Sequence, residues 1–210
     1  MRTDHHDRRG VAAFDFDGTI AKGDSLLPFL KRAVGRRAVA GAVFSHLPQL
    51  LRVKLTNTQH GKVKEKFIET LLAGKELDVM QRHAQSYAQH MVETQVFTQA
   101  KERIAWHKAH GYETIMVSAS PDIYLKPTAE LLGIDHAITT SLEVNNGRLT
   151  GRFVGNNVRD TEKERLLRDY LNNEPVELWA YGNSDGDKQM LAMADHPYWA
   201  NSDGVISPLQ

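Results

Sequence analysis

A short apolar stretch that ends in two aspartates constrains this chain more than any other part of its sequence. Residues 11–14 are apolar without helical spacing, a pattern typical of a strand buried on both faces. Asp15 and Asp17 follow two positions apart, so both side chains leave the same side of an extended backbone. Two like charges are costly to bury unless a cation or well-placed donors compensate them. Because Gly18 permits a sharp turn and Thr19 follows it, the stretch predicts a divalent cation and a phosphate at the carboxyl end of a strand.

Three further segments follow this stretch in a fixed order along the chain. Ser118 comes directly after the apolar run 115–117, Lys163 lies near the start of a helical pattern, and the segment 182–187 follows another apolar run. Together these motifs resemble the DxDGT signature and its accompanying motifs in the haloacid dehalogenase (HAD) superfamily, whose members are mostly Mg²⁺-dependent phosphohydrolases. The layout is most similar to the branch that includes phosphoserine phosphatase, with one insert after the first motif. The resemblance covers residues 11 to about 203.

Composition describes an ordinary globular chain and excludes several kinds of site. Its 210 residues are enough for one α/β domain with an insert or for two small domains. Lys+Arg and Asp+Glu are both 26, so net charge gives no argument for a nucleic acid or an anionic membrane surface as partner. The absence of cysteine excludes disulfides, thiolate metal sites and cysteine nucleophiles, and it favours a reducing, cytoplasmic compartment. No uncharged apolar run approaches the ~20 residues that span a bilayer.

The remaining pattern predicts an α/β fold with an inserted helical cap. Residues 1–10 are polar and are expected to form a flexible tail. Helical spacing with few strand signals over 22–96 predicts a compact α-helical cap, in which we expect 38–51 to be a buried helix. Strand and helix patterns alternate in the core domain, which comprises 11–21 and 97–210. This alternation favours a Rossmann-like, mostly parallel sheet with helices on both faces.

Local signals place the elements more closely. We expect strands over 11–17, 114–118, 137–144, 148–154, 176–181 and 198–201, and core helices over 99–110, 124–132, 161–171 and 189–194. We expect the cap helices to break or bend at Gly35, Gly41, Pro48, Gly61 and Gly74. The sequence 145–147, Asn-Asn-Gly, is a strong hairpin turn signal. Thr161 and Glu164 are spaced as a capping box.

The two aspartates have the residue type and spacing that phosphate ester hydrolysis requires. The reaction needs a nucleophile, a proton source for the leaving oxygen and positive charge around the transferring group. Asp15 would attack phosphorus and form an aspartyl-phosphate, and Asp17 would protonate the leaving alcohol and later activate water. The resemblance implies that Lys163 neutralises the phosphate and the nucleophile together, with Arg165 and Lys188 as alternatives.

Further residues are expected to bind the phosphate. Thr19 and Ser118 would donate hydrogen bonds to its oxygens, each from just beyond a strand end. Backbone N–H groups of Phe16, Gly18 and Ala119 could add to this cradle.

The resemblance implies a Mg²⁺ cofactor held by the first and last motifs. Asp15 and the backbone carbonyl of Asp17 would supply two of the oxygen ligands that Mg²⁺ prefers. Relatives usually carry aspartate where this chain has Asn183, whose amide oxygen can still ligate but brings no negative charge. The metal could therefore bind more weakly, or depend directly on Asp187 or Asp185.

The substrate is less constrained than the reaction. Asp24 lies nine residues after Asp15, where phosphoserine phosphatases carry an acidic residue that recognises the substrate's amine; the N-cap of a helix is the favoured alternative. Candidate substrates are small molecules: phosphoserine, other amino-alcohol phosphates, or a lipid-derived phosphate if 38–51 faces the site. Phosphoserine would call for a cationic cap residue. The available ones are Arg36, Arg37, Arg52, Lys54 and Lys62.

Two other functional interpretations stay open. Phosphotransfer to a second alcohol would use the same groups with a different acceptor. A non-catalytic binding or regulatory protein would treat Asn183 as the mark of a decayed metal site. Dehalogenation is disfavoured because dehalogenases lack the second aspartate, which Asp17 supplies here. The sequence leaves the oligomeric state undetermined.

Overall fold

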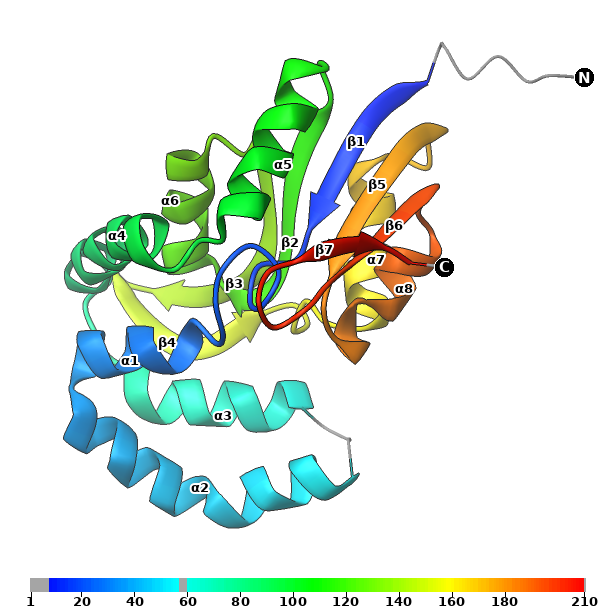
Figure 1. Ribbon diagram of the computed structural model, residues 1–210. Helices are drawn as coiled ribbons and strands as arrows, with labels where there is room; N and C mark the ends of the chain where they lie inside the picture. The colour runs from blue at the N-terminus through cyan, green and yellow to red at the C-terminus, as the bar shows by residue number, and fades with distance from the viewer. Residues whose placement is uncertain (1–7, 57–59, 210) are drawn as a thin grey trace, which may run out of the picture.

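The computed structural model describes residues 8–56 and 60–209, with side chains for 8–48 and 61–209. Within these residues, seven strands form one sheet in the order β4-β3-β2-β1-β5-β6-β7 (Figure 1). The strands are β1 (Arg9–Phe14), β2 (Glu113–Pro121), β3 (His136–Asn145), β4 (Arg148–Val154), β5 (Val176–Gly182), β6 (His196–Ala200) and β7 (Ile206–Pro208). The helices are α1 (Leu26–Val34), α2 (Arg36–Thr56), α3 (His60–Leu72), α4 (Leu77–Thr94), α5 (Thr98–Ala109), α6 (Asp122–Leu132), α7 (Thr161–Tyr170) and α8 (Lys188–Ala192), with a 3₁₀ turn η1 (Asp185–Asp187).

The strand order creates a crevice at the middle of the sheet. β1 pairs in parallel with β2 on one side and with β5 on the other, and β3 and β6 continue the parallel pairing outward. Only β4 and β7, at the two edges, run antiparallel to their neighbours. The chain thus leaves β1 toward one edge and later returns to the other side of it. In such α/β sheets, ligands bind beyond the carboxyl ends of the strands at this switch point.

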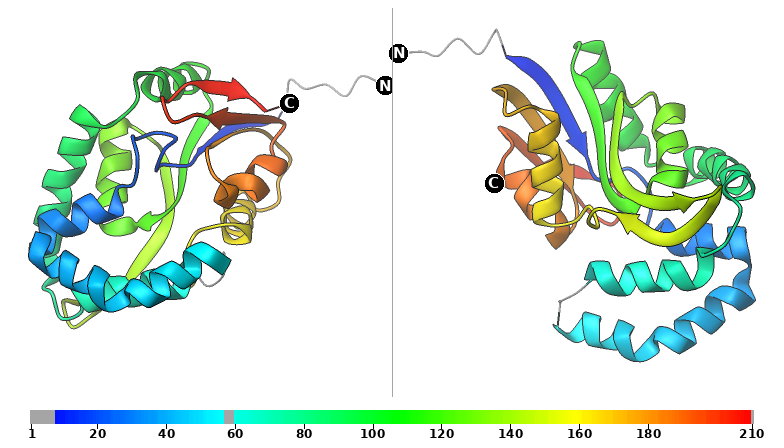
Figure 2. Two further views of the ribbon diagram at one scale, coloured as in Figure 1. Left: turned by 60° about the horizontal axis from the view of Figure 1, so that its bottom comes forward. Right: turned by 180° about the vertical axis from the view of Figure 1, so that it is seen from behind.

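Two hydrophobic layers cover the sheet, as the alternation along β1 requires. Ala12 and Phe14 belong to one buried cluster, which includes residues of α5 and α6, and Val11 and Ala13 belong to another, which includes residues of α7 and α8. Figure 2 shows these helix pairs on opposite faces of the sheet. The α/β fold with a mostly parallel sheet is confirmed. None of the described helices combines the length and apolar character that crossing a bilayer requires.

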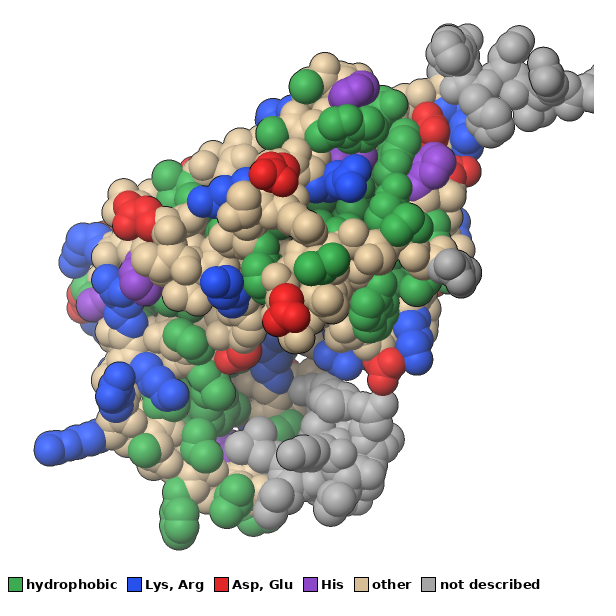
Figure 3. All heavy atoms as spheres, in the orientation of Figure 1, with side chains coloured by type: hydrophobic (Ala, Val, Ile, Leu, Met, Phe, Trp, Pro, Cys, Tyr) green, Lys and Arg blue, Asp and Glu red, His purple; other side chains and the backbone are tan. Residues whose placement is uncertain are grey.

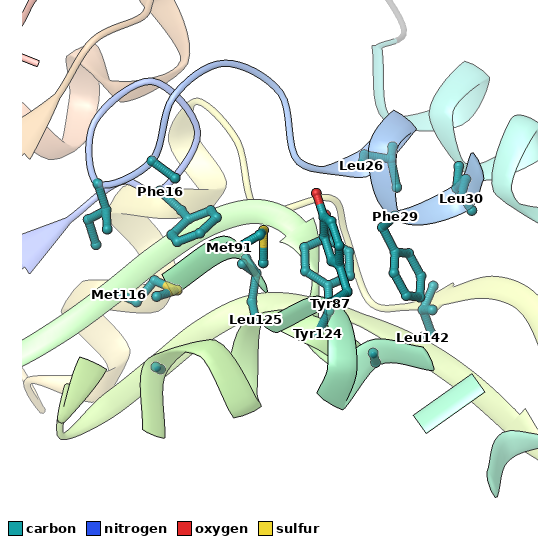
Figure 4. Close-up of a cluster of buried hydrophobic side chains, with 14 of the residues drawn as sticks. Phe16, Leu26, Phe29, Leu30, Tyr87, Met91, Met116, Tyr124, Leu125 and Leu142 are labelled. Carbon is teal, nitrogen blue, oxygen red and sulfur yellow. The ribbon is translucent and has the colours of Figure 1, made fainter. Parts of the chain in front are cut away.

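The helical insert joins the core through aromatic side chains. α2 and α3 lie side by side at the far end of the insert, whereas α4 packs along α6 (Figure 1). The rings of Tyr87 on α4 and Phe29 on α1 lie 5.5 and 4.7 Å from the ring of Tyr124 on α6 (Figure 4). The separation of a cap over 22–96 from the core stays a prediction, since its last helix is packed on the core.

Helix α2 differs most from its expected environment. The segment 38–51 was expected to be a buried helix, but of its described side chains Phe44 is 80% exposed and Leu47 is 43% exposed. Val39 and Ala42, one turn apart, are buried. The prediction of burial is wrong for the described part of α2 (residues 36–48), where Val39 and Ala42 are buried but the larger apolar side chains Phe44 and Leu47 lie outside the packed stripe.

The cap helices break at two of the five positions where a break or bend was expected. Gly35 and Gly74 separate helices, whereas Gly41 and Pro48 lie inside α2 and Gly61 lies inside α3, where a bend stays a prediction. Glycine and proline weaken a helix by propensity, but tertiary packing overrides this preference here.

The expected capping box of α7 does not form. Thr161 is the first helical residue, the N-cap is Asp160, and Glu164 pairs with Arg168 instead. The strand β7 was not expected at all. β1 begins at Arg9, inside the expected tail, and ends before Asp15; the tail's residues 1–7 lie outside the described residues.

The other expected strands and core helices are confirmed within a few residues. The turn between β3 and β4 is confirmed as well, with positive φ at Asn146 (49°) and Gly147 (72°), as a type I′ turn requires.

A buried histidine gives a pH-dependent stability. His107 is fully buried, its Nε2 lies 2.8 Å from the Tyr181 hydroxyl, and burial lowers its pKa to about 4. The unfolded chain therefore binds this proton at higher pH than the folded chain, and stability falls as pH drops from about 6.5 to 4. We expect the free energy of unfolding in urea to lose about 2–3 kcal/mol from this group over that range. His107→Gln should remove that part of the slope; equal slopes in both proteins would contradict the prediction.

Candidate active site

The motifs meet at the carboxyl ends of three neighbouring strands. Phe14, the last residue of β1, lies beside Met116 of β2 and Tyr181 of β5. Asp15 therefore follows β1 where Ser118 lies in β2 and Asn183 follows β5. In the space-filling view, this face is hollowed between the core and the α2–α3 pair, with Lys or Arg side chains at the edge of the hollow (Figure 3).

Lys163 connects the first motif to the last. Its Nζ lies 2.5 Å from Asp15 Oδ1 and 2.6 Å from Asp187 Oδ1. All three residues are buried, with exposed fractions of 2% for Lys163, 6% for Asp15 and 1% for Asp187. Lys163 thus contacts Asp15, while the roles of Asp15 as nucleophile and of Lys163 as its neutralising cation stay predictions. Arg165 and Lys188, the alternatives, form exposed ion pairs elsewhere.

The charges of this buried triad do not balance. One ammonium faces two carboxylates, which leaves an excess negative charge away from water. Burial raises the pKa of Asp15 to about 7, against the lowering effect of Lys163. Burial also acts to lower the pKa of Lys163, but the charges of Asp15 and Asp187 outweigh it and the pKa is raised. A further cation beside Asp15 would keep this carboxylate ionised at neutral pH.

Asp187 organises the last motif. Its Oδ2 accepts hydrogen bonds from the backbone N–H of Asn183 (3.1 Å) and from the N–H (2.9 Å) and hydroxyl (2.8 Å) of Ser184. A Cβ on Gly182 would lie 2.5 Å from the Asp187 Cβ, so this close approach needs glycine. Both carboxylate oxygens of Asp187 are thus engaged by protein groups.

Asn183 supplies an oxygen that the protein does not use. Its Oδ1 is buried and has no hydrogen-bond partner among the described residues. The side chain lies directly against the first motif, since a Cβ on Gly18 would meet its Nδ2 at 2.0 Å. A buried, unpaired amide oxygen beside the aspartates fits a ligand for a hard cation.

The residues beside Asp15 and Asn183 fit a Mg²⁺ site made of oxygen ligands. The described residues contain no cluster of three or more His, Cys, Asp or Glu side chains that could hold a metal. The expected ligands do not form such a cluster, because the carbonyl of Asp17 and the amide of Asn183 stand beside only two side chains of these types, Asp15 and Asp187. Asp185 is paired with Lys188 at 2.7 Å on the surface, and direct ligation by Asp185 or Asp187 stays a prediction.

Asp17 is held by a different set of partners. Its Oδ1 accepts a hydrogen bond from the Ser25 N–H (2.9 Å), and its Oδ2 accepts one from the Ser120 hydroxyl (2.5 Å). Burial raises the pKa of Asp17, while these two hydrogen bonds oppose the rise. Sequence reasoning missed Ser25 and Ser120, because lone serines in loops carry no signal by themselves.

The expected phosphate ligands lie around these aspartates. Thr19 is fully buried and its hydroxyl donates to Asp15 Oδ2 at 3.3 Å. Ser118 is 1% exposed and its hydroxyl accepts the Ser120 N–H at 3.2 Å. The N–H of Gly18 is already bonded to Ala21 O at 2.7 Å, so it does not join the expected cradle in this structure. The phosphate-binding roles of Thr19, Ser118, Ala119 and Lys163 stay predictions.

Lys64 of α3 is a cation at this site that the sequence did not single out. Its Nζ donates to the carbonyl of Ala119 at 2.8 Å. Burial lowers its pKa to about 8, although the charges of Asp17 and Asp24 oppose this. Among the cap cations considered from the sequence, Lys62 is exposed, and the side chains of Arg52 and Lys54 lie outside the described ones.

Asp24 lies one position before Ser25, the N-cap residue of α1. Its Oδ2 accepts the Leu27 N–H at 3.0 Å, so Asp24 pairs a free N–H of the first turn although it is not itself the expected N-cap. The residue is exposed, and a contact with substrate stays a prediction.

Comparison with known proteins decides the family. Residues 12–192 match the model of the haloacid dehalogenase-like hydrolase family. The chain belongs to this family. The protein CicA of Caulobacter vibrioides is 33% identical over 186 residues, which cover 88% of this chain and 83% of CicA. A probable phosphatase of Mycobacterium tuberculosis is 29% identical over 205 residues, which cover 93% of this chain and 70% of that protein.

The HAD-family fold agrees with a solved structure. A crystal structure of phosphoserine phosphatase in its apo form superposes with a TM-score of 0.63 at 20% identity, over 90% of this chain and 85% of that chain. The family that the motifs indicated, the HAD hydrolases, is therefore confirmed.

Proposed function

We propose that this chain, a HAD-type phosphatase, hydrolyses a small phosphate monoester through an aspartyl-phosphate on Asp15, with Mg²⁺ as cofactor. The observation that supports this most is the buried contact of Lys163 with both Asp15 and Asp187. It supplies a nucleophile and a fixed positive charge at the same place. The excess negative charge and the unpaired Asn183 oxygen favour the binding of a cation beside Asp15.

The first half-reaction transfers the phosphoryl group to the enzyme. A carboxylate oxygen of Asp15 forms a bond to phosphorus while the bond between phosphorus and the ester oxygen breaks. Protonated Asp17 gives its proton to the leaving oxygen, so that an alcohol departs. Lys163, Thr19 and Ser118 would stabilise the charge on the phosphoryl oxygens.

The second half-reaction returns the enzyme to its starting state. The carboxylate of Asp17 removes a proton from water, whose oxygen bonds to phosphorus as the bond to Asp15 breaks. The products are inorganic phosphate and free Asp15. Asp15, the Asp17 carbonyl and Asn183 would hold Mg²⁺, which when bound offsets the negative charge of substrate and nucleophile.

The substrate class is the finer part of the proposal. Phosphoserine and related amino-alcohol phosphates are the leading candidates, because relatives include phosphoserine phosphatases. Lys64 offers a cation toward an anionic group of such a substrate, and Asp24 offers a carboxylate toward an amine. Phosphotransfer differs only in the acceptor, so the release of inorganic phosphate into water separates the two activities.

The test of this function is a panel of phosphate monoesters, including 4-nitrophenyl phosphate, phosphoserine and phosphoethanolamine. We expect inorganic phosphate to be released in the presence of Mg²⁺. We expect a chelator to abolish the release and added Mg²⁺ to restore it. No turnover of any ester at millimolar Mg²⁺ would overturn the proposal in favour of a non-catalytic protein.

The role of Asn183 predicts a specific change in metal dependence. Asn183→Ala removes the unpaired oxygen, and we expect the Mg²⁺ concentration for half-maximal activity to rise by about 10-fold or more. Asp185→Asn, on the same loop but paired with Lys188, should leave it unchanged. The measurement is the Mg²⁺ titration of 4-nitrophenyl phosphate turnover. A larger effect from Asp185→Asn would assign the ligand to that residue instead.

A further inference from the structure

We infer that Ser120 is a positioning residue for Asp17, and that Ser25 and Tyr124 hold the Ser120 hydroxyl in the orientation that this role needs. The inference rests on the proposed function, because it takes Asp17 as the group that protonates the leaving oxygen. Ser25, Ser120 and Tyr124 are none of the residues that the family resemblance assigned to the site. Their role predicts that the effect of a substitution depends on the leaving group.

Both oxygens of the Asp17 carboxylate are held, and by separate elements. Ser120, near the end of β2, binds Oδ2 at 2.5 Å, and the N–H of Ser25, just before α1, binds Oδ1 at 2.9 Å. A carboxylate held at both oxygens cannot turn about its Cβ–Cγ bond without losing a hydrogen bond. The direction in which Asp17 presents its proton is thereby fixed.

Counting protons gives the direction of the bonds behind Ser120. An ionised carboxylate only accepts, and a protonated one keeps acceptor capacity, so in both states Ser120 can donate its single hydroxyl proton to Asp17. Ser120 Oγ then accepts from Ser25 Oγ at 3.4 Å. Since that uses the proton of Ser25, the Tyr124 hydroxyl, 3.0 Å from Ser25 Oγ, is the donor to it. The result is a chain from Tyr124 through Ser25 and Ser120 to Asp17.

The hydroxyls of Tyr124, Ser25 and Ser120 are buried and held by packed neighbours. Ser25, Ser120 and Tyr124 are 4%, 2% and 0% exposed, so water does not compete for their hydroxyls. The Tyr124 ring packs against the rings of Phe29 and Tyr87, which also contact each other (Figure 4). The Tyr87 hydroxyl donates to the Ser25 carbonyl at 2.8 Å and so fixes the backbone whose N–H binds Asp17. Buried networks with every member paired specify one geometry.

The same backbone segment also positions the predicted phosphate ligand. The Ser120 N–H donates to the Ser118 hydroxyl at 3.2 Å, and the pairing of β2 with β3 shifts register between Ser118 and Pro121. Such irregularities re-aim side chains beside active sites. Residues 118–120 thus set the position of the acid relative to the phosphate, while Lys163 and Thr19 hold Asp15 independently.

A misplaced acid affects substrates according to their leaving groups. In the first half-reaction, 4-nitrophenolate departs without a proton, whereas an alkoxide needs the proton of Asp17. We expect Ser120→Ala to lower kcat/KM for an alkyl phosphate by about 10-fold to 100-fold, and for 4-nitrophenyl phosphate by no more than about 3-fold. A merely structural loss would lower both values alike.

The experiment compares kcat/KM of these two esters at saturating Mg²⁺. Ser120→Thr restores a hydroxyl and should recover most of the alkyl phosphate activity. Tyr124→Phe removes the start of the chain at nearly constant volume and should give a smaller loss in the same direction. Thr128→Val is the matched control, because it removes a buried hydroxyl from the same helix. That hydroxyl donates to the backbone carbonyl of Tyr124 at 2.6 Å and does not contact the hydroxyls of Tyr124, Ser25 or Ser120. Thermal unfolding establishes that each variant is folded.

Asp17→Asn separates this inference from the proposed function. If Asp17→Asn discriminates between the esters and Ser120→Ala does not, the positioning role is overturned and the function stands. If Asp17→Asn lowers kcat/KM of both esters equally, the positioning role is overturned, and turnover by the native protein leaves the proposed hydrolysis standing. If the native protein hydrolyses neither ester, both are overturned. The alkyl-selective pattern in Thr128→Val would likewise overturn the role of Ser120.

Discussion

Asp15→Asn is expected to abolish turnover of every phosphate ester, with a loss of about 10⁴-fold or more in kcat. The amide is too weak a nucleophile to attack phosphorus, yet it has nearly the size of the carboxylate and can keep the Thr19 contact. The change also relieves the charge excess around Lys163, so we expect the folded state to be at least as stable as in the native protein. The measurements are release of inorganic phosphate and thermal unfolding.

A covalent readout makes this test specific. In acid-quenched reactions with a radiolabelled substrate, the native protein should retain label and Asp15→Asn should not. Asp169→Asn is the control, since it makes the same chemical change at an exposed ion pair with Arg165. Residual activity in Asp15→Asn within about 10-fold of the native protein would remove Asp15 from the nucleophile's role.

The sequence predicted those parts of the site that follow strand ends. Asp15, Ser118 and Asn183 each come directly after or within a buried apolar run, and parallel strands bring their carboxyl ends to one edge. Lys163 was predicted from its place on the first turn of a helix, and it contacts Asp15, whereas Arg165 forms an ion pair with Asp169.

The remaining parts had no local signal. Ser25, Lys64 and Ser120 reach the site from separate segments, and each is of a residue type that is common on surfaces and in turns. The positions of Ser25 and Lys64 depend on how α1 and α3 pack against the core, and that of Ser120 depends on the register shift near the end of β2; hydrophobic periodicity specifies neither.

The insert shows the same limit on a larger scale. The apolar residues of 38–51 predicted burial, but burial depends on which face of a helix meets its neighbours, and Phe44 and Leu47 of α2 lie on a face that stays exposed. Gly41 and Gly61 predicted breaks from propensity alone, although packing keeps both helices continuous.

Lys163→Met is expected to affect activity and stability together, through one physical cause. Methionine has a similar length, so the variant leaves Asp15 and Asp187 buried with no ammonium between them. Losing the cation of a buried pair costs about 3–5 kcal/mol, so we expect a fall of this size in the free energy of unfolding in chelator. Turnover should fall by about 10³-fold, because fixed positive charge at the phosphoryl group is lost.

Two comparisons separate this cause from a general packing defect. Arg165→Met removes a cation from the same helix, but its ion pairs are exposed, so the free energy of unfolding should change by no more than about 1 kcal/mol. Mg²⁺ should stabilise Lys163→Met by more than it stabilises the native protein, since a cation beside Asp15 then compensates a larger charge excess. If Mg²⁺ stabilised both proteins equally, the buried charge imbalance would not be what the metal relieves, and the argument for a metal site at Asp15 would lose its electrostatic basis.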